Sequence, residues 1–141
     1  MRKVMVFGTF DILHKGHLNF FRQAKKHGDY LIAVVARDKN VRKIKKKKPR
    51  NNEFVRLLNV ALVKTVNIAA LGSLKDPYKI IEEKKPNIIC LGYDQNSYSD
   101  KLEEKLKKRK LKTKVIRLKP YKAYKYKSSK LKIFSVQFYN F

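Results

Sequence analysis

The sequence predicts an α/β fold in which a five-stranded parallel sheet is covered by helices on both faces. Two observations predict it: short apolar runs with strand-like composition recur along the chain, and segments with helical spacing of apolar residues separate them. Strands that alternate with helices are joined by right-handed crossovers, which place helices over both faces of a parallel sheet. A chain of 141 residues can bury one substantial core, so we expect a single domain over residues 1–141.

The expected strands are the short apolar runs 4–7, 30–35, 66–71, 88–91 and 115–118. Each is bounded by turn or charged residues, as buried strands are. Four helices are expected between them, and the last is the charged segment 102–110. The apolar positions of the other three are Leu18, Phe21 and Ala24; Phe54, Leu57, Leu58 and Ala61; and Tyr78 with Ile81. Residues 131–141 form a tail with two open interpretations: the chain can begin a helix after Ser128 and Ser129, but residues 133–139 have strand-like composition.

The charge of the chain points to anionic partners. Lys and Arg number 36 against 11 Asp and Glu, which leaves a net charge of +25. The excess concentrates in residues 37–50, interpreted as a basic loop after the second strand, and in residues 101–132. A solvated, lysine-rich surface without any specific anionic partner would also explain much of this positive charge. Because neither stretch has the signature of a nucleic-acid-binding module, any nucleic-acid binding is expected to be non-specific.

The cellular compartment is predicted from two further features. Cys90 is the single cysteine, so an intramolecular disulfide is excluded, and its apolar run predicts a buried, inert thiol. The N-terminal apolar run is too short for a signal peptide, and no run of apolar residues is long enough to span a membrane. We therefore expect a soluble cytoplasmic protein.

The first strand-to-helix junction carries the candidate chemistry. Ligands of open parallel sheets bind beyond the carboxyl ends of the strands, and here residues 8–17 lead into a helix that begins near Gly16. Gly8 permits close approach of a ligand to the backbone, and the helix N-terminus offers N–H groups to an anion. His14 and His17 can face one phosphate and stabilise its charge, although a structural role for two histidines at this spacing is also open.

These residues resemble a nucleotidyltransferase signature. Gly-Thr-Phe-Asp at residues 8–11 and His-Lys-Gly-His at residues 14–17 are similar to the motif of the cytidylyltransferase-like family. The similarity extends to Glu53 and Arg56, which resemble a helix-borne Glu-x-x-Arg of that family, and through most of the chain. The resemblance implies a Rossmann-like fold of the nucleotidyltransferase (HIGH) superfamily and a homodimer.

Within that family the later motifs favour the archaeal-type FAD synthases. The segments that carry this resemblance are residues 36–38, 71–75, 92–95 and 126–129. It implies transfer of AMP from ATP to FMN, with release of pyrophosphate. The alternative inside the same chemistry is transfer of CMP from CTP to glycerol 3-phosphate or a similar phospho-alcohol, but the Arg-Thr-x-Gly-Ile-Ser-Thr-Thr-like stretch usual in those enzymes is missing. A third hypothesis is a non-catalytic, basic nucleic-acid-binding protein on the same scaffold.

The resemblance implies a role for each candidate residue. His14, His17 and Lys43 are the predicted catalytic residues, and Lys43, Lys45 and Arg56 the predicted phosphate and acceptor ligands. Asp11 is linked to the expected Mg²⁺ cofactor, with a turn cap as the alternative. Arg56 has a surface salt bridge with Glu53 as its alternative. The predicted nucleotide-binding set is Gly8, Thr9, Phe10, Asp11, His14, His17, Gly92, Asp94, Gln95, Ser128 and Ser129. Ser128 and Ser129 could instead simply cap a helix. The turn that begins at Gly92 could instead be an ordinary turn without a ligand.

Overall fold

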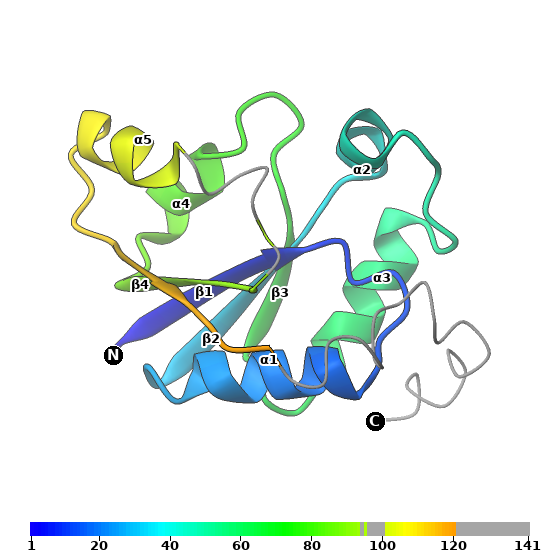
Figure 1. Cartoon of the computed structure of the whole chain (residues 1–141), viewed down its shortest axis with the longest axis horizontal. Helices are drawn as coiled ribbons and strands as arrows, with labels where there is room; N and C mark the ends of the chain where they lie inside the picture. The colour runs from blue at the N-terminus through cyan, green and yellow to red at the C-terminus, as the bar shows by residue number, and fades with distance from the viewer. Residues whose placement is uncertain (94, 96–100, 121–141) are drawn as a thin grey trace.

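The structure is a computed structural model, and it describes residues 1–93, 95 and 101–120 (Figure 1). Asp94, Ser128, Ser129 and the 131–141 tail lie outside these residues. The strands are β1 Lys3–Gly8, β2 Tyr30–Val35, β3 Ile68–Leu71, β4 Ile88–Leu91 and β5 Lys114–Arg117. The helices are α1 Lys15–Lys25, α2 Asp38–Lys45, α3 Glu53–Ala61, α4 Lys79–Lys84 and α5 Leu102–Lys108. None of the helices in the described part of the chain is long and apolar enough to cross a membrane.

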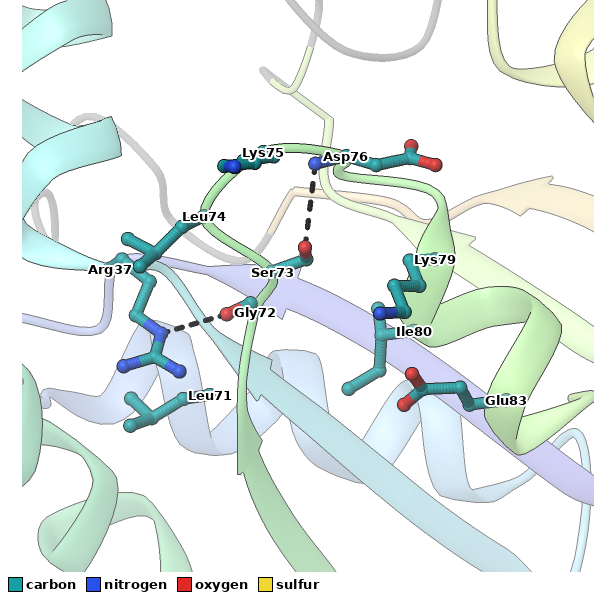
Figure 2. A pocket seen from close by; sticks show the side chains of 10 residues that line it. All are labelled: Arg37, Leu71, Gly72, Ser73, Leu74, Lys75, Asp76, Lys79, Ile80 and Glu83. Atoms are coloured by element: carbon teal, nitrogen blue, oxygen red, sulfur yellow. Dashed lines mark hydrogen bonds between the residues drawn. The ribbon is translucent and has the colours of Figure 1, made fainter.

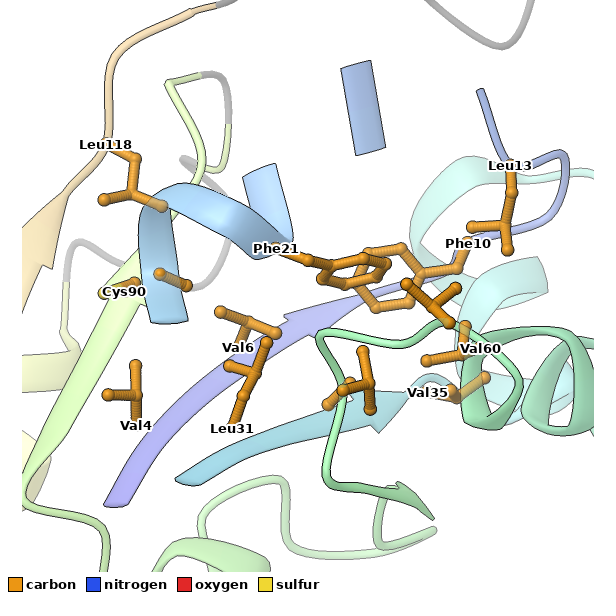
Figure 3. Packing of buried hydrophobic residues seen from close by; sticks show 14 of the residues in the cluster. Val4, Val6, Phe10, Leu13, Phe21, Leu31, Val35, Val60, Cys90 and Leu118 are labelled. Atoms are coloured by element: carbon orange, nitrogen blue, oxygen red, sulfur yellow. The ribbon is translucent and has the colours of Figure 1, made fainter. Parts of the chain in front are cut away.

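The five strands form one parallel sheet in the order β3-β2-β1-β4-β5, which confirms the predicted fold class. Helices α1 and α3 cover one face, and α4 and α5 cover the other (Figure 1). The central strand β1 is buried on both sides: Val4 and Val6 pack toward α1 and α3 (Figure 3), whereas Met5 packs toward α4 and α5. Burial of both faces explains why the strands read as continuous apolar runs.

Three predicted strands have slightly different bounds in the structure. β1 is longer than predicted by one residue at each end, Lys3 and Gly8. β3 begins at Ile68 rather than at Val66, because Val66 donates its N–H to the Val63 carbonyl in the turn after α3. β5 is displaced by one residue, although Leu118 still donates to the Leu91 carbonyl at 2.8 Å. These are differences at strand ends, where turn hydrogen bonds compete with the sheet.

The basic loop predicted over residues 37–50 is wrong in its first half, which forms helix α2. Its first turn holds Asp38, and its last turn holds Arg42, Lys43 and Lys45. This charge order suits the helix dipole, because carboxylates stabilise the N-terminus and cations the C-terminus. Only Val41 of this helix is buried. A single apolar contact produces no visible periodicity, which is why the sequence pattern concealed the helix.

Helix α3 was predicted at the right place, but most of its predicted apolar face lies away from the core. Phe54 and Leu58 are 62% and 64% exposed, whereas Arg56, Asn59 and Val60 are buried. The cause lies at the N-terminus of the helix, where Arg56 is drawn inward by polar partners described below. Of the predicted apolar stripe, Leu57 packs against the core as expected, whereas Phe54, Leu58 and Ala61 are exposed.

Candidate active site

The N-terminus of α1 is capped by the two histidines of the junction after β1. His14 Nδ1 accepts a hydrogen bond from the Gly16 N–H at 3.1 Å, and His17 Nδ1 accepts one from the His14 N–H at 3.3 Å. Because both Nδ1 atoms are acceptors, the proton of each neutral ring lies on Nε2. The first turn of α1 holds no acidic residue, so no carboxylate offsets the positive end of the helix dipole.

Both imidazoles are held in the neutral form. Burial lowers the pKa of His14 to about 4. Burial and the positive charges of His14 and Lys45 lower the pKa of His17 to about 3, against a smaller, opposite effect of a hydrogen bond with the Ile12 backbone. The two ring centroids are only 4.0 Å apart. At neutral pH both rings of this pair are therefore uncharged, and the ring of His17 also hydrogen-bonds the Ile12 backbone. A bound anionic phosphate would favour protonation of the pair.

The lowered pKa values predict that the protein loses stability in mild acid. The unfolded histidines take up protons as the pH falls below their ordinary value of 6.5, whereas the folded rings resist protonation until about pH 4 and pH 3. Above pH 6.5 the histidines are neutral in both states and the free energy of unfolding is not reduced by them. As the pH falls below 6.5, proton uptake favours the unfolded state and the free energy of unfolding decreases. Between pH 7 and pH 5 we expect the free energy of unfolding to fall by roughly 1 to 2 kcal/mol for each histidine.

Urea unfolding at the two pH values measures this loss. The control is the double variant His14→Gln, His17→Gln, whose stability should change much less between pH 7 and pH 5. Asp38 and Asp76 do not interfere, because their lowered pKa values act only below about pH 4. An equal loss in the wild type and the double variant would contradict the prediction.

Gly8 and Phe10 shape the junction from inside. Phe10 has a left-handed backbone, with φ of 52°, and its ring is buried against Phe21 at 5.1 Å and edge-on to His17 at 5.7 Å. A Cβ added at Gly8 would come within 2.6 Å of the Phe10 ring. Packing against the Phe10 ring therefore explains why a glycine stands at position 8. The predicted reason was different, namely the close approach of a ligand to the backbone. Binding of the triphosphate by the backbone of Thr9 and Phe10 stays a prediction.

Asp11 organises the segment that precedes α3. Its carboxylate accepts hydrogen bonds from the backbone N–H groups of Arg50 and Asn51 at 2.7 and 2.9 Å, and its carbonyl accepts one from the Asn51 amide. This is the capping role that the sequence left open as the alternative to a metal role. The described residues contain no group of three His, Cys, Asp or Glu side chains that could hold a metal ion by themselves.

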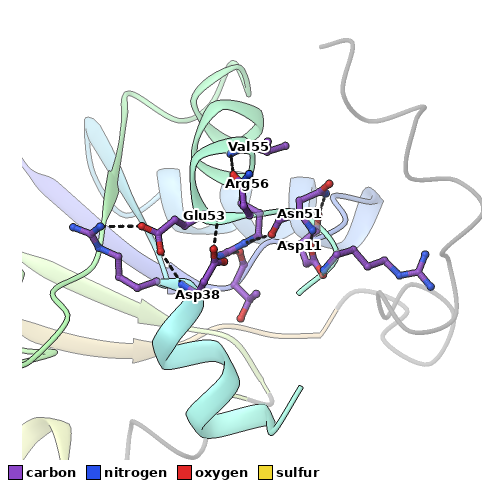
Figure 4. Close-up of polar contacts among 10 residues, drawn as sticks. Asp11, Asp38, Asn51, Glu53, Val55 and Arg56 are labelled. Atoms are coloured by element: carbon purple, nitrogen blue, oxygen red, sulfur yellow. Dashed lines mark hydrogen bonds and ion pairs between the residues drawn. The ribbon is translucent and has the colours of Figure 1, made fainter. Parts of the chain in front are cut away.

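The N-termini of α2 and α3 cap each other (Figure 4). The Asp38 N–H donates to the Glu53 carboxylate at 2.9 Å, and the Glu53 N–H donates to the Asp38 carboxylate at 3.2 Å. Glu53 also pairs with Arg37 at 2.9 Å. Each helix dipole is therefore already neutralised by a carboxylate. Among α1, α2 and α3, only α1 keeps an N-terminus without an acidic cap.

Arg56 connects this capped pair to the junction. Its guanidinium donates to the Asp38 carboxylate at 2.7 Å, to the Thr9 carbonyl at 2.8 Å and to the Asn51 carbonyl at 3.0 Å, and the side chain is fully buried. Burial raises the pKa of Asp38, but hydrogen bonds from Arg56 and from the Glu53 backbone outweigh it and hold that pKa below its usual value.

The surface salt bridge with Glu53 that the sequence left open for Arg56 does not form, because Glu53 pairs with Arg37. Phosphate binding by Arg56 stays a prediction.

The two candidate lysines of α2 differ in their electrostatic effect on His17. Lys43 and Lys45 are both exposed near the C-terminus of α2. The charge of Lys45 is one of the causes that lower the pKa of His17. This favours Lys45 among the candidates of the lysine run as the cation beside a phosphate at the histidines.

The turn after β4 is fastened to the end of β1. Gln95 donates from Nε2 to the Phe7 carbonyl at 2.6 Å and accepts at Oε1 from the Gly92 N–H at 2.7 Å. Arg117 donates to the Gly92 carbonyl at 2.8 Å. The structure therefore shows Gln95 and Gly92 as parts of an ordered turn, and their contact with a nucleotide base stays a prediction. Cys90, just before this turn, is buried, and burial raises its thiol pKa to about 11.

Three polar residues without a predicted role are central to this arrangement: Arg37, Asp38 and Arg117. All three lie at the carboxyl ends of strands, since Arg37 and Asp38 follow β2 and Arg117 ends β5. That position was a usable signal, because ligand sites of parallel sheets form there. The partners themselves were not predictable, because each contact joins segments far apart in the chain.

Comparison with known proteins agrees with this geometry. Residues 5–133 match the family described as cytidylyltransferase-like. An FAD synthase from Ferroglobus placidus is 49% identical over 77% of this chain and 70% of its own length, and one from Archaeoglobus profundus is 51% identical over 77% and 69%. The crystal structure of a lipopolysaccharide core biosynthesis protein from Thermoplasma volcanium superposes with a TM-score of 0.82 at 41% identity, over 86% of this chain and 98% of that one. The chain belongs to the cytidylyltransferase-like family.

Proposed function

We propose that this protein is an FAD synthase, which transfers AMP from ATP to FMN and releases pyrophosphate. The observation that carries the proposal is the identity of about half of the aligned residues to archaeal FAD synthases, over most of both chains. The site supports it, because α1 is the one helix among α1, α2 and α3 whose first turn holds no acidic residue, and its N-terminus carries two neutral imidazoles suited to a phosphate. The same identity disfavours CTP with glycerol 3-phosphate, and also a non-catalytic nucleic-acid-binding protein.

The reaction needs positioning and charge stabilisation rather than a general base. An oxygen of the FMN phosphate attacks the α-phosphorus of ATP, a new P–O bond forms, and the bond to the bridging oxygen of the β-phosphate breaks so that pyrophosphate leaves. The attacking phosphate is already an anion, so no proton has to be removed from it. His14 and His17 donate Nε2–H to the α-phosphate oxygens, where negative charge builds. Lys45 and Lys43, both in the last turn of α2, neutralise the departing phosphates.

Mg²⁺ is the proposed cofactor, and Asp11 is its proposed protein ligand. Magnesium in nucleotide sites is commonly held by one carboxylate together with phosphate oxygens and water. Each Asp11 oxygen accepts one backbone hydrogen bond, which leaves further lone pairs for a cation. When bound, the ion would neutralise charge on the triphosphate.

A homodimer is the proposed assembly, in the cytoplasm. The outer face of α3 supports it, because Phe54, Leu58 and Leu62 are each more than half exposed and lie on one side of the helix at spacings of four residues. An uncharged face is the surface on which two such basic chains can meet with least repulsion. The variant Leu58→Arg is expected to be a folded monomer by light scattering. An unchanged mass, or a monomeric wild type, would refute the association.

Pyrophosphate release tests the activity directly. Purified protein with Mg²⁺ is assayed with ATP or CTP, each against FMN or glycerol 3-phosphate. Release with ATP and FMN, and with neither CTP nor glycerol 3-phosphate, is expected. Release only with CTP and glycerol 3-phosphate would replace the proposal by the cytidylyltransferase alternative. The absence of pyrophosphate release in all four assays, together with steeply salt-dependent binding to DNA of any sequence, would favour the nucleic-acid-binding alternative.

A further inference from the structure

We propose that a cavity at the carboxyl end of β3 binds the isoalloxazine ring of FMN, an inference that rests on the proposed function. The cavity has a volume of about 560 Å³, within the usual range for small-molecule sites. Figure 2 shows the loop that follows β3 arching over it, with Arg37 and Leu71 on one side and Lys79, Ile80 and Glu83 of α4 on the other. The predicted machinery at the histidines does not use this cavity.

The lining is held in shape by hydrogen bonds across its rim. Arg37 donates from Nε to the Gly72 carbonyl at 2.9 Å, the Asn40 amide donates to the Ser73 carbonyl at 3.0 Å, and the Asp76 N–H donates to the Ser73 hydroxyl at 3.4 Å. The first two contacts hold the arching loop against the N-terminal part of α2, and the third closes a turn within the loop. The cavity is therefore a built feature of the fold, and a ligand would find its walls largely in place.

The lining combines apolar and polar side chains, as a planar, partly polar ring requires. Leu71 and Leu74 offer apolar surface on the side of Arg37, and Ile80 offers it on the side of α4; Leu74 is 51% exposed and is therefore open to a ligand. Lys79 and Glu83 stand one helical turn apart on α4. An ammonium can donate to the carbonyl oxygens of the flavin pyrimidine ring, and a carboxylate can accept from its N3–H. Both are exposed and, among the described residues, neither forms an ion pair.

The start of the histidine junction lies within the length of FMN from the cavity. Gly8 at the end of β1 is in register with Val35 of β2, which is in register with Leu71 of β3. Gly8, where the junction begins, and Leu71, which lines the cavity, are therefore two strand spacings apart, or about 10 Å. The ribityl chain with its phosphate spans a comparable distance when extended. A ring in the cavity would place the FMN phosphate at the start of the junction that carries His14 and His17.

Two surface variants test the assignment. Lys79→Glu and Leu74→Glu change exposed side chains of the cavity, so neither should disturb folding. We expect each to raise both the Kd for FMN, measured by flavin fluorescence without ATP, and the KM for FMN by about tenfold or more. The KM for ATP should stay within about twofold, and kcat at saturating FMN should be retained, because the histidine site is untouched.

Lys107→Glu is the matched control. Lys107 is an exposed lysine that lines a second cavity of about 340 Å³, between α5 and β5. The change puts a glutamate four residues from Glu103, just as Lys79→Glu puts one four residues from Glu83, so both variants carry the same helical repulsion. Only the Lys79 variant should lose FMN affinity.

The outcomes separate this inference from the proposed function. If the wild type makes FAD while both cavity variants keep the wild-type Kd and KM for FMN, the flavin lies elsewhere and the proposed function stands. If the wild type makes no FAD from ATP and FMN, the proposed function falls, and the flavin assignment falls with it. Equal losses in Lys79→Glu and Lys107→Glu would also overturn the assignment, because they would reflect net charge alone.

Discussion

Replacing His14 or His17 with alanine should lower kcat by about a hundredfold or more, because each change removes one Nε2–H donor from the charge that develops on the transferred phosphate. Both rings are fixed for this task by their Nδ1 hydrogen bonds, so the donor geometry exists before substrate arrives. The measurement is pyrophosphate release at saturating ATP and FMN. Unchanged turnover in both variants would remove the histidines from the chemistry.

Asparagine and glutamine variants separate catalysis from capping. In His14→Asn the side-chain oxygen takes the place of Nδ1, and asparagine is a strong N-cap, so the bond from the Gly16 N–H should persist and stability should stay close to wild type. Its turnover should nevertheless fall as far as that of the alanine variant, since nothing replaces Nε2–H. His14→Gln carries an amide N–H near the Nε2 position and should recover part of the activity. A His14→Asn variant with wild-type turnover would show that only the cap matters.

The fold could be predicted from the sequence largely because its strands are buried on both faces. Continuous apolar runs such as residues 30–35 stand out against a charged background, and their alternation with helices leaves few topologies. The failures share a cause. Helix α2 buries little more than Val41, and α3 turns most of its predicted apolar side outward, so in both helices polar contacts override the apolar pattern. Such contacts depend on partners brought together only by folding.

The candidate site also has a part that the sequence predicts and a part that only the structure shows. The junction holding His14 and His17 was predictable, because a strand end followed by a helix start is a local signal. Its support was not predictable: Arg37 and Asp38 were visible only as part of a motif, and their bonds to Glu53 and Arg56 cross about fifteen residues or more. Local signals located the residues proposed for the chemistry, whereas the residues that hold them required the structure.

Removing the Arg56 guanidinium should have a large effect on stability, and this distinguishes the two roles open to that residue. Arg56→Met keeps an unbranched apolar side chain in the fully buried space but leaves the Asp38 carboxylate without its cation and the carbonyls of Thr9 and Asn51 without this donor. Breaking a buried ion pair from one side costs about 3 to 5 kcal/mol; because the Asp38 carboxylate is 21% exposed, we expect a loss near the lower end, about 3 kcal/mol, in urea unfolding. Arg109→Met is the control, because it removes a guanidinium that pairs with Asp76 and Glu82 nearer the surface, and its loss should be much smaller.

The conservative variant Arg56→Lys decides how the residue acts. A lysine keeps the positive charge for a phosphate but cannot direct donors to three separate acceptors, so the framework role predicts that most of the stability is lost even in this variant. A phosphate-binding role instead predicts near wild-type stability for Arg56→Lys with a raised KM for ATP or FMN. Because the guanidinium holds the Thr9 carbonyl at the start of the junction, the framework role also predicts lower kcat in the variant that still folds. Wild-type stability in Arg56→Lys would therefore contradict the framework role and restore the phosphate ligand predicted from the sequence.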